Sequence, residues 1–372
     1  MNAKKLKPRA AQSKSFRELL LVVLLCSTLS SGALSADKAE SAPPAPGYKS
    51  REEVWAAIRS GELKTVKPPK QMPAGVQLTK DIEYGKVGKR SLKLDMYRLT
   101  KQKKPVPGLI FIHGGAWKGS NKDRCRLYAA RYAQQGYVAV SISYRLSGEA
   151  PFPAAVQDAK CAVRWMRANA AEYGVDPNNI CVLGGSAGGH LAMMVGYSSD
   201  AKRLEGRGGH QNVSSRVQAV VNLYGPCDLT VPVVRQVDAV QEFLGGKKYD
   251  QEPDLYKKAS PISYLTKDDP PTLILHGTLD ALVPINQSDK LVKRLKEVAV
   301  PYTYDRLAGW PHVMDIAEPV YKRCLFFIDR FLAEQMPVPT PEWQRQQRQT
   351  QTVRPVPKAR TCALVWSDLM FP

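Results

Sequence analysis

Two patterns of hydrophobic and polar residues divide the chain. Residues 76–98 alternate apolar and polar side chains around Gly85 and the pair Gly88-Lys89, which predicts one or two β-hairpins. From Val106 onward, short uninterrupted apolar runs appear instead, as expected for strands that are buried on both faces. Helical stretches separate these runs. The change of pattern predicts hairpins at the start of the fold and a buried parallel sheet after them.

The alternation of strands and helices after Val106 predicts the α/β class, with a mostly parallel central sheet and helices on both faces. The predicted strands are 108–113, 137–144, 180–183, 217–223, 272–276 and 302–307. The predicted helices are 124–135, 153–173, 186–197, 287–298 and 318–335, preceded by a short helix at 52–62. Residues 226–265 break this alternation with prolines and short helical pieces, and they are expected to form a small cap over the site.

The two ends of the chain differ from its middle. Six Lys and Arg residues precede an apolar run at 19–26, and small residues follow, which predicts a secretory signal peptide over residues 1–36. We therefore expect a secreted or periplasmic protein. The remaining expected parts are a linker with the short helix (37–75), the α/β domain (76–335) and a disordered basic tail rich in Pro, Gln and Arg (336–372).

The composition narrows the functional classes. The 372 residues are 44% hydrophobic, as in globular proteins, and the formal net charge is +20. A basic body is compatible with an acidic polysaccharide, an anionic surface or nucleic acid. No cluster of basic residues is interleaved with aromatics, so we expect a solvated basic surface and no nucleic-acid partner. The strongest apolar run has eight residues, far fewer than the roughly 20 that span a bilayer, so no stable membrane span is expected after signal removal.

The cysteines and the oligomeric state are less informative. Seven cysteines are present and none forms a CxxC motif, which gives no support to a zinc ribbon or a redox pair. Export permits disulfides, but the spacing leaves their pairing open. No spacing of His, Cys or carboxylate residues suggests a metal, and no cofactor is expected. The oligomeric state is not predicted.

The strongest chemical motif is Gly184-Gly185-Ser186-Ala187-Gly188, which matches G-x-S-x-G. It follows a predicted strand and opens a predicted helix. Such a turn is so tight that the residues two before and two after the serine must lack bulk. The turn lifts the serine hydroxyl above the sheet, and the helix N-terminus offers N–H groups to a developing oxyanion. A phosphate-binding loop is excluded, because Gly-Lys-Ser/Thr and the G-x-G-x-x-G spacing are absent.

A second motif, His113-Gly114-Gly115-Ala116-Trp117, follows the strand predicted at 108–113. Two glycines allow the backbone to turn its N–H groups toward a neighbouring site. We assign the amides of Gly115 and Ala116, with that of Ala187, to an oxyanion hole. His113 itself is expected to brace this loop.

A nucleophilic serine needs a base, and elimination among five histidines favours His312. His113 lies in a strand, His190 would point along its helix, His210 lies in a Gly/Arg loop, and His276 ends a strand where bracing is expected. His312 lies in a loop between the last strand and the last helix. That loop opens at the C-terminal edge of the sheet, where open α/β sheets place their sites.

The base needs a carboxylate to orient it, and Asp280 lies just past the strand at 272–276. Asp268 and Asp269 precede that strand and lie at the wrong edge, and Asp289 falls in the following helix. The chain order Ser186, Asp280, His312 is that of α/β-hydrolases.

Four segments, HGGAW (113–117), GGSAGGH (184–190), HGTLDALVP (276–284) and WPH (310–312), together resemble secreted bacterial esterases of the α/β-hydrolase fold. The set is most similar to bifunctional acetylxylan and feruloyl esterases, with hormone-sensitive-lipase-like esterases as wider relatives. The resemblance covers roughly residues 84–335. It implies a triad of Ser186, Asp280 and His312, and an oxyanion hole of Gly115, Ala116 and Ala187. Ala116 replaces a third glycine that is common in the wider group.

The resemblance and the predicted export suggest a carboxylesterase for short acyl or aromatic esters, such as acetyl or feruloyl groups on plant polysaccharide. Trp117, Tyr224, Cys227 and Phe243 are candidate substrate-lining residues, although each residue type is more often found in a core. Two alternatives stay open. One is an arylformamidase-like hydrolase, since HGG-x-W also occurs there, although export argues against it. The other is a non-catalytic binding protein on a hydrolase scaffold.

Overall fold

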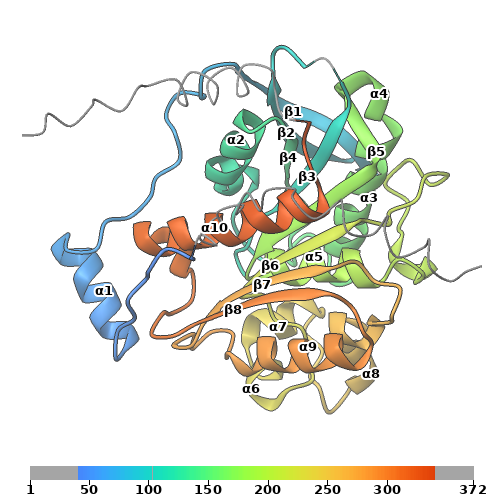
Figure 1. The fold of residues 1–372 in the computed structure, drawn as a ribbon. Helices are drawn as coiled ribbons and strands as arrows, with labels where there is room; N and C mark the ends of the chain where they lie inside the picture. Colours follow the sequence, from blue (N-terminus) through green and yellow to red (C-terminus); the bar gives the residue numbers. More distant parts are fainter. Residues whose placement is uncertain (1–40, 103, 340–372) are drawn as a thin grey trace, which may run out of the picture. The chain divides into compact units, whose positions relative to one another are not determined.

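The computed structural model describes residues 41–102 and 104–339, whose centre is one eight-stranded sheet. The strand order is β1-β2-β4-β3-β5-β6-β7-β8 (Figure 1). The strands are β1 (Val76–Val87), β2 (Arg90–Leu99), β3 (Val106–Ile112), β4 (Val138–Ile142), β5 (Val175–Gly185), β6 (Ala219–Leu223), β7 (Thr272–Gly277) and β8 (Tyr302–Leu307). The first two form the predicted hairpin, β2 pairs antiparallel with β4, and all later pairs are parallel. The predicted α/β class is confirmed.

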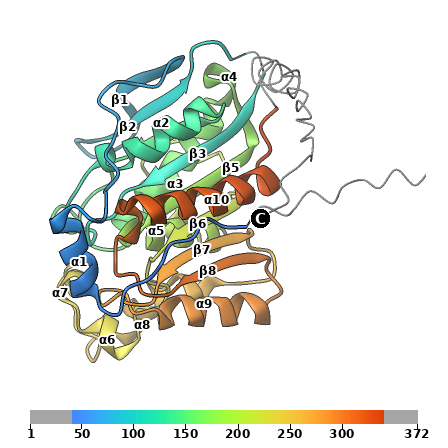
Figure 2. The same cartoon turned by 60° about the vertical axis from the view of Figure 1, so that its left-hand side comes forward.

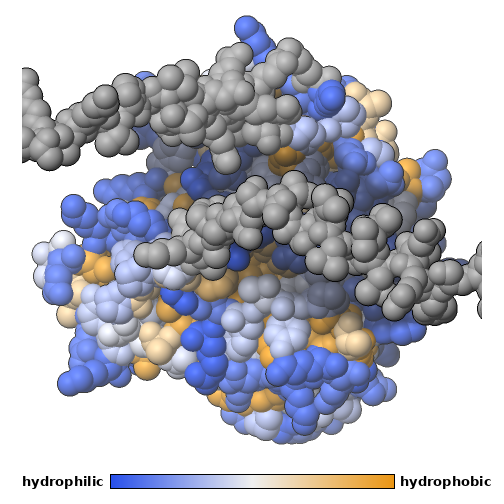
Figure 3. Space-filling model, in the orientation of Figure 1, coloured by the Kyte–Doolittle hydropathy of each residue, from blue (hydrophilic) through white to orange (hydrophobic). Residues whose placement is uncertain are grey.

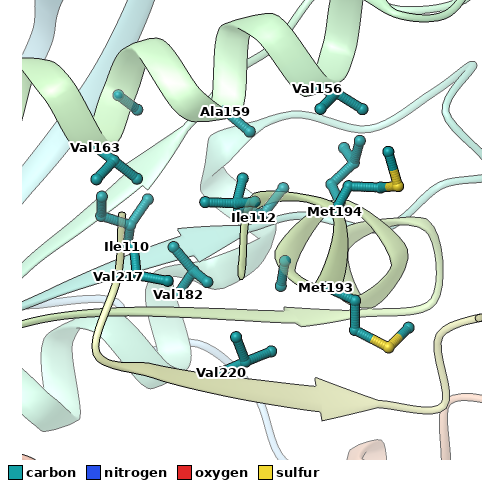
Figure 4. Close-up of a cluster of buried hydrophobic side chains, with 14 of the residues drawn as sticks. Ile110, Ile112, Val156, Ala159, Val163, Val182, Met193, Met194, Val217 and Val220 are labelled. Atoms are coloured by element: carbon teal, nitrogen blue, oxygen red, sulfur yellow. The ribbon is translucent and has the colours of Figure 1, made fainter. Parts of the chain in front are cut away.

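Alternate residues of each central strand belong to different cores. Leu109 and Phe111 of β3 face one hydrophobic cluster, whereas Ile110 and Ile112 face the other. Figure 4 shows the second of these clusters, in which Ile110 and Ile112 meet Val182 and side chains from two helices. Every residue of β3 is buried, which explains why the sequence is apolar without alternation.

Helices cover both faces of the sheet. One cluster includes residues of α3 (Ala154–Ala168), α5 (Ala187–Tyr197) and α9 (Asn286–Glu297). The other includes residues of α1 (Arg51–Ser60), α2 (Arg126–Gln134) and α10 (Glu318–Gln335). Figures 1 and 2 show α2 and α10 on the opposite side of the sheet from α3 and α5. Because the strands between these helices are parallel, their carboxyl ends lie at one edge of the sheet, where the candidate site is found.

One predicted helix is divided. The sequence predicts a continuous helix at 153–173, but α3 ends at Ala168 and a short α4 (Ala170–Tyr173) follows. The Asn169 side chain donates a hydrogen bond to the Trp165 carbonyl at 2.8 Å, so it competes with the backbone ladder at the break. The other long helices begin and end within a few residues of their predicted bounds.

The segment predicted as a cap, 226–265, holds short helices: α6 (Pro232–Arg235), α7 (Asp238–Phe243), α8 (Pro253–Lys258) and a 3₁₀ turn at Pro261–Tyr264. The predicted signal peptide (1–36) and most of the predicted tail (336–372) lie outside the described residues. In the described part of the chain, none of the helices has the length and hydropathy that crossing a bilayer requires. Figure 3 shows hydrophilic residues interspersed with hydrophobic ones on the face that it draws.

Candidate active site

Ser186 lies at the turn between β5 and α5 in an uncommon backbone conformation, with φ 57° and ψ −125°. A non-glycine residue reaches this region only when its surroundings enforce it. Here the Ser186 N–H donates to the Leu223 carbonyl at 2.9 Å, and the Ser186 carbonyl accepts from the His190 N–H at 3.0 Å. The turn is therefore fixed from β6 and from the first turn of α5, as the G-x-S-x-G motif requires.

The glycines around Ser186 are needed for close approach. A Cβ on Gly184 would lie 2.3 Å from the backbone of Gly188, and a Cβ on Gly188 would lie 2.0 Å from the Ile112 carbonyl oxygen. A Cβ on Gly189 would lie 2.4 Å from the Asn222 side-chain oxygen. The helix can start directly behind the serine only because these side chains are absent.

The structure brings Ser186, His312 and Asp280 into one line of hydrogen bonds. His312 Nε2 lies 2.9 Å from Ser186 Oγ, and His312 Nδ1 lies 2.5 Å from Asp280 Oδ2. Asp280 and His312 are buried, and both lie in loops that follow parallel strands at the carboxyl edge of the sheet. An imidazole with one nitrogen on a carboxylate and the other on a hydroxyl can accept the hydroxyl proton.

The Asp280 carboxylate has four hydrogen-bond partners. Its Oδ1 accepts the N–H groups of Leu282 and Val283 at 2.9 and 2.8 Å. Its Oδ2 contacts His312 and also His276 Nε2, at 3.1 Å. Burial acts to raise the pKa of Asp280, but the hydrogen bonds from the two imidazoles outweigh it, and the pKa lies below its ordinary value. Asp280 is therefore ionised at neutral pH, as a partner for an imidazolium must be.

The proposed oxyanion loop has three consecutive residues with left-handed φ: Gly115 at 109°, Ala116 at 53° and Trp117 at 57°. A Cβ on Gly115 would lie 2.4 Å from the Gly119 carbonyl oxygen, so glycine is required there. In the described chain the amide N–H groups of Gly115, Ala116 and Ala187 have no hydrogen-bond acceptor. Three such amides beside Ser186 suit the stabilisation of an oxyanion.

Trp117 anchors this strained loop and does not line the pocket. Its side chain is buried, its Nε1–H donates to His190 Nδ1 at 3.2 Å, and its ring stacks on Phe243 at 4.6 Å between centroids. The His190 Nε2 in turn donates to the Ala259 carbonyl at 2.7 Å. These contacts connect the oxyanion loop to α5 and to the 226–265 segment.

A pocket of about 810 Å³ contains Ser186 and His312. This volume is within the range of small-molecule sites. One part of the lining is apolar, from Phe111, Leu127, Leu183, Leu223 and Ile328, and another part is polar, from Ser120, Asn121, Asp123, Arg124 and Asp315. Val66, Pro68, Leu282 and Ile316 also line it. The pocket can therefore take an apolar group and a polar group together.

Of the four candidate substrate-lining residues, Tyr224 lies in the pocket lining, and Trp117, Cys227 and Phe243 do not. Cys227 and Phe243 are buried, and Cys227 Sγ donates to the Gln287 carbonyl. The lining also contains no residue from 226–265, so this segment packs beside the oxyanion loop and does not overhang the pocket as expected. Its buried residues, Phe243 and Tyr256 among them, belong to the same hydrophobic cluster as α3 and α5, so the segment packs onto that side of the sheet.

The polar part of the pocket depends on Asp315, which the sequence does not single out. Its two carboxylate oxygens accept from Tyr224 at 2.5 Å and from Tyr128 at 2.9 Å. The Tyr224 ring also meets the His312 ring edge-on, with 4.8 Å between centroids. Burial and the nearby Asp315 raise the pKa of Tyr224 and of Tyr128 well above their ordinary values, so both phenols remain donors. Asp315 is three residues after His312, and this short spacing is the feature of the sequence that could have indicated its place in the pocket.

Contacts support the bracing that the sequence predicts for His113 and His276. His190 does not simply point along its helix, because its ring links Trp117 to Ala259. Burial lowers the pKa of His113 and of His190 to about 4, so both are neutral near pH 7. His113 contacts the Gly114 carbonyl at 2.7 Å and stacks on Tyr144. His276 is buried between Asp280 and Ser288, the latter at 2.7 Å. None of these three imidazole rings forms a hydrogen bond with the Ser186 hydroxyl.

The described cysteines are unpaired, and no group of three or more His, Cys, Asp or Glu in the described ranges could hold a metal. Burial raises the pKa of the Cys125 thiol, which lines the pocket, to about 12. A thiol with such a pKa is a poor nucleophile at neutral pH. Ser186, whose hydroxyl contacts an imidazole, is therefore the candidate nucleophile in this pocket.

Comparisons with known proteins identify the family of this chain. A family model described as BD-FAE matches residues 94–295, which is more than half of the chain. The chain belongs to the BD-FAE family. The match includes Ser186 and Asp280 and ends before His312. The chain has the α/β-hydrolase fold, because its solved neighbours are esterases of that fold.

Curated relatives of this BD-FAE protein carry esterase names. The esterase LipQ of Mycobacterium tuberculosis is 35% identical over 280 residues, which are 73% of this chain and 66% of LipQ. The esterase LipC of the same organism is 35% identical over 232 residues, 60% of this chain and 57% of LipC. The chain thus spans between 57% and 66% of the length of these two relatives.

Two solved structures match over nearly their whole length. A truncated carbohydrate esterase from gut microbiota is 30% identical, with a TM-score of 0.62, over 72% of this chain and 99% of that one. The thermophilic esterase Est2 of Thermogutta terrifontis, solved with propionate bound, is 28% identical, with a TM-score of 0.62, over 72% of this chain and 97% of Est2.

Proposed function

We propose that this protein is a serine carboxylesterase. The observation that carries the proposal is the hydrogen-bonded line Ser186–His312–Asp280, which ends in a pocket beside three amides without acceptors. The esterase names of the relatives support the same activity.

In the proposed reaction, His312 Nε2 accepts the Ser186 proton while Oγ attacks the ester carbonyl carbon. The carbonyl oxygen becomes negative and is stabilised by the N–H groups of Gly115, Ala116 and Ala187. The ionised Asp280 orients the imidazole and stabilises its protonated form. His312 then gives its proton to the departing alcohol. In the second half, His312 takes a proton from water as the water oxygen attacks the acyl carbon, and it returns that proton to Ser186 Oγ as the acid leaves.

The finer proposal is that the enzyme is exported and removes short acyl or aromatic groups, such as acetyl or feruloyl groups, from plant polysaccharide. The N-terminal signal pattern supports export. The structural likeness to a carbohydrate esterase supports a carbohydrate context, and the propionate bound to Est2 supports short acyl groups. The polar part of the pocket, with Asp315 and Arg124, suits an alcohol that is rich in hydroxyl groups.

The test is acid release by the wild type and by Ser186→Ala. The substrates are acetylated and feruloylated xylan and p-nitrophenyl esters from acetate to octanoate. Ser263→Ala, an exposed serine in the 226–265 segment, is the matched control. Hydrolysis of aryl esters that Ser186→Ala loses and Ser263→Ala keeps supports the esterase. Release of acetate or ferulate from xylan supports the polysaccharide substrate. Aryl-ester hydrolysis without release from xylan overturns the polysaccharide substrate alone, and an inactive wild type favours the binding-protein alternative.

A further inference from the structure

The loop that carries His312 is held by the N-terminal part of the chain. Residues 43–68, here called the N-terminal brace, precede the family match at 94–295. The brace contains α1, and Figures 1 and 2 show α1 beside the beginning of α10. Its contacts fall on both sides of His312 in the sequence, as follows.

The first contact is with the two residues before Pro311-His312. The Tyr48 N–H donates to the Gly309 carbonyl at 3.0 Å, and Trp310 Nε1 donates to the Ala45 carbonyl at 3.2 Å. The backbones approach so closely that a Cβ on Gly47 would lie 2.2 Å from the Ala308 carbonyl oxygen. Trp310 is completely buried, so this contact is part of the core and not a surface touch.

The second contact is with the residues after His312. The Val66 N–H donates to the Ile316 carbonyl at 2.8 Å, and the Glu318 N–H donates to the Lys64 carbonyl at 2.9 Å. Between these bonds, Thr65 and Ala317 form a short antiparallel bridge. The loop therefore has a hydrogen-bonded support on each side of the histidine.

The loop needs such support because its conformation is strained. Val313, directly after His312, has φ 60° and ψ 34°. A β-branched residue is a rare outlier in this left-handed region, and its strain persists only where the surroundings over-determine the backbone. On the sheet side, the Leu279 N–H donates to the Trp310 carbonyl at 2.9 Å, close to Asp280. The brace closes the loop from the other side.

The brace also contributes to the pocket. Val66 is half-buried and lines it together with Pro68, and Leu282 and Ile316 also belong to this lining. Leu282 is 68% exposed, which places this apolar group where the pocket meets solvent.

We propose that the N-terminal brace is a working part of the active site: it positions His312 for proton transfer, and Val66 forms a selectivity-determining wall. The inference rests on the proposed esterase function. The brace would then contribute both to the position of the catalytic base and to the wall of the pocket.

The positioning role is tested with Gly47→Ala, whose Cβ forces the brace away from Ala308. Gly148→Ala is the matched control, because a Cβ there meets no atom within 4 Å. We expect kcat for p-nitrophenyl butyrate and the rate of Ser186 labelling by a fluorophosphonate to fall at least tenfold in Gly47→Ala, with KM within about twofold. Gly148→Ala should match the wild type. Rates are taken per folded protein from circular dichroism.

The wall is tested separately with Val66→Ala and Val66→Phe, on acyl series and alcohol series of esters. We expect the ratio of kcat/KM between the largest and the smallest substrate to change at least fivefold, in opposite directions for the two variants, in one of the series. Unchanged kcat and labelling in a folded Gly47→Ala protein overturns the positioning role, and unchanged ratios in both series overturn the wall. If the wild type neither hydrolyses nor labels, the esterase proposal fails and this inference fails with it. An active wild type with unaffected variants overturns this inference alone.

Discussion

Four buried histidines with different partners have different tasks in this protein. His312 shares its two nitrogens between a hydroxyl and an ionised carboxylate, so its proton can move. His190 and His113, in contrast, have carbonyl and ring partners, and burial lowers the pKa of each to about 4. His276 holds the Asp280 carboxylate from the other side. His276 also contacts a serine hydroxyl, that of Ser288, but Ser288 is buried outside the pocket lining, whereas Ser186 lines the pocket. Access of the hydroxyl partner to the pocket therefore separates the proposed proton acceptor from a brace.

Replacement of Asp280 by Asn tests the orientation of the base. The new amide N–H would face His312 Nδ1 as a donor, so the imidazole would hold its proton on Nε2 and could not accept one from Ser186. We expect kcat to fall by about three to four orders of magnitude while KM changes little. The measurement is steady-state hydrolysis of p-nitrophenyl butyrate.

Asp268→Asn is the matched control, because Asp268 is exposed and pairs with Lys267 at the opposite edge of the sheet. It should keep wild-type kcat. A similar loss in both variants, or full activity in Asp280→Asn, would contradict the assigned role.

At the scale of elements, the junction of β3, β5 and α5 determines the distance between the nucleophile and the oxyanion loop. Gly188 of α5 approaches the Ile112 carbonyl at the end of β3, and the oxyanion loop starts directly after that strand. The helix and the loop are therefore fixed by the same contact. A change in this contact alters the geometry of the amides without touching any of them.

Gly188→Ala would place a Cβ 2.0 Å from the Ile112 oxygen and push α5 away from β3. We expect kcat to fall at least 100-fold and the free energy of unfolding to fall by about 1–3 kcal/mol. Urea denaturation and ester hydrolysis measure the two effects, and Gly148→Ala should show neither. Normal activity in a Gly188→Ala protein would show that α5 can shift without moving the site.

The sequence predicts most of the elements because buried parallel strands and amphipathic helices leave strong patterns, as in β3 and α10. It also predicts Ser186, Asp280 and His312, since each follows a strand at the same edge of the sheet. It does not predict the lining by Val66, Tyr128 and Asp315, because these depend on contacts between segments that are far apart in the chain. The prediction that Trp117 and Phe243 line the pocket is wrong for a similar reason: an aromatic side chain near a site can equally serve as its anchor.

At the scale of the whole molecule, burial of neutral histidines links the stability of the fold to pH. A buried histidine with a folded pKa of about 4 binds fewer protons than in the unfolded chain, where its pKa is about 6.5. The contribution of the neutral histidine to the free energy of unfolding is complete above pH 6.5 and is lost as the pH falls toward 4. Asp280, whose pKa is lowered, retains its contribution until the pH falls below about 4.

His190→Gln removes one of these titrations while its amide can still bond to Trp117 and Ala259. Between pH 6.5 and 4, we expect the wild type to lose stability relative to this variant by about 1.4 kcal/mol for each pH unit. Urea midpoints across pH measure the difference. Above about pH 7.5, which exceeds both the folded and the unfolded pKa of the histidine, the difference in midpoint should no longer change with pH. The variant must be compared with the wild type because burial raises the pKa of Asp269 to about 6. Protonation of Asp269 stabilises the fold as the pH falls through the same range, which opposes the effect of the histidines. A difference that does not vary with pH would contradict the neutral state of His190.

The central claim is that Ser186 is a nucleophile activated by His312. The most direct measurement is the site of covalent attachment of a fluorophosphonate, found by mass spectrometry of the intact chain and its peptides. We expect one adduct per chain on Ser186, none in Ser186→Ala, and labelling at least 100-fold slower in His312→Asn. An adduct on another residue, or equal labelling of Ser186→Ala, would contradict the account.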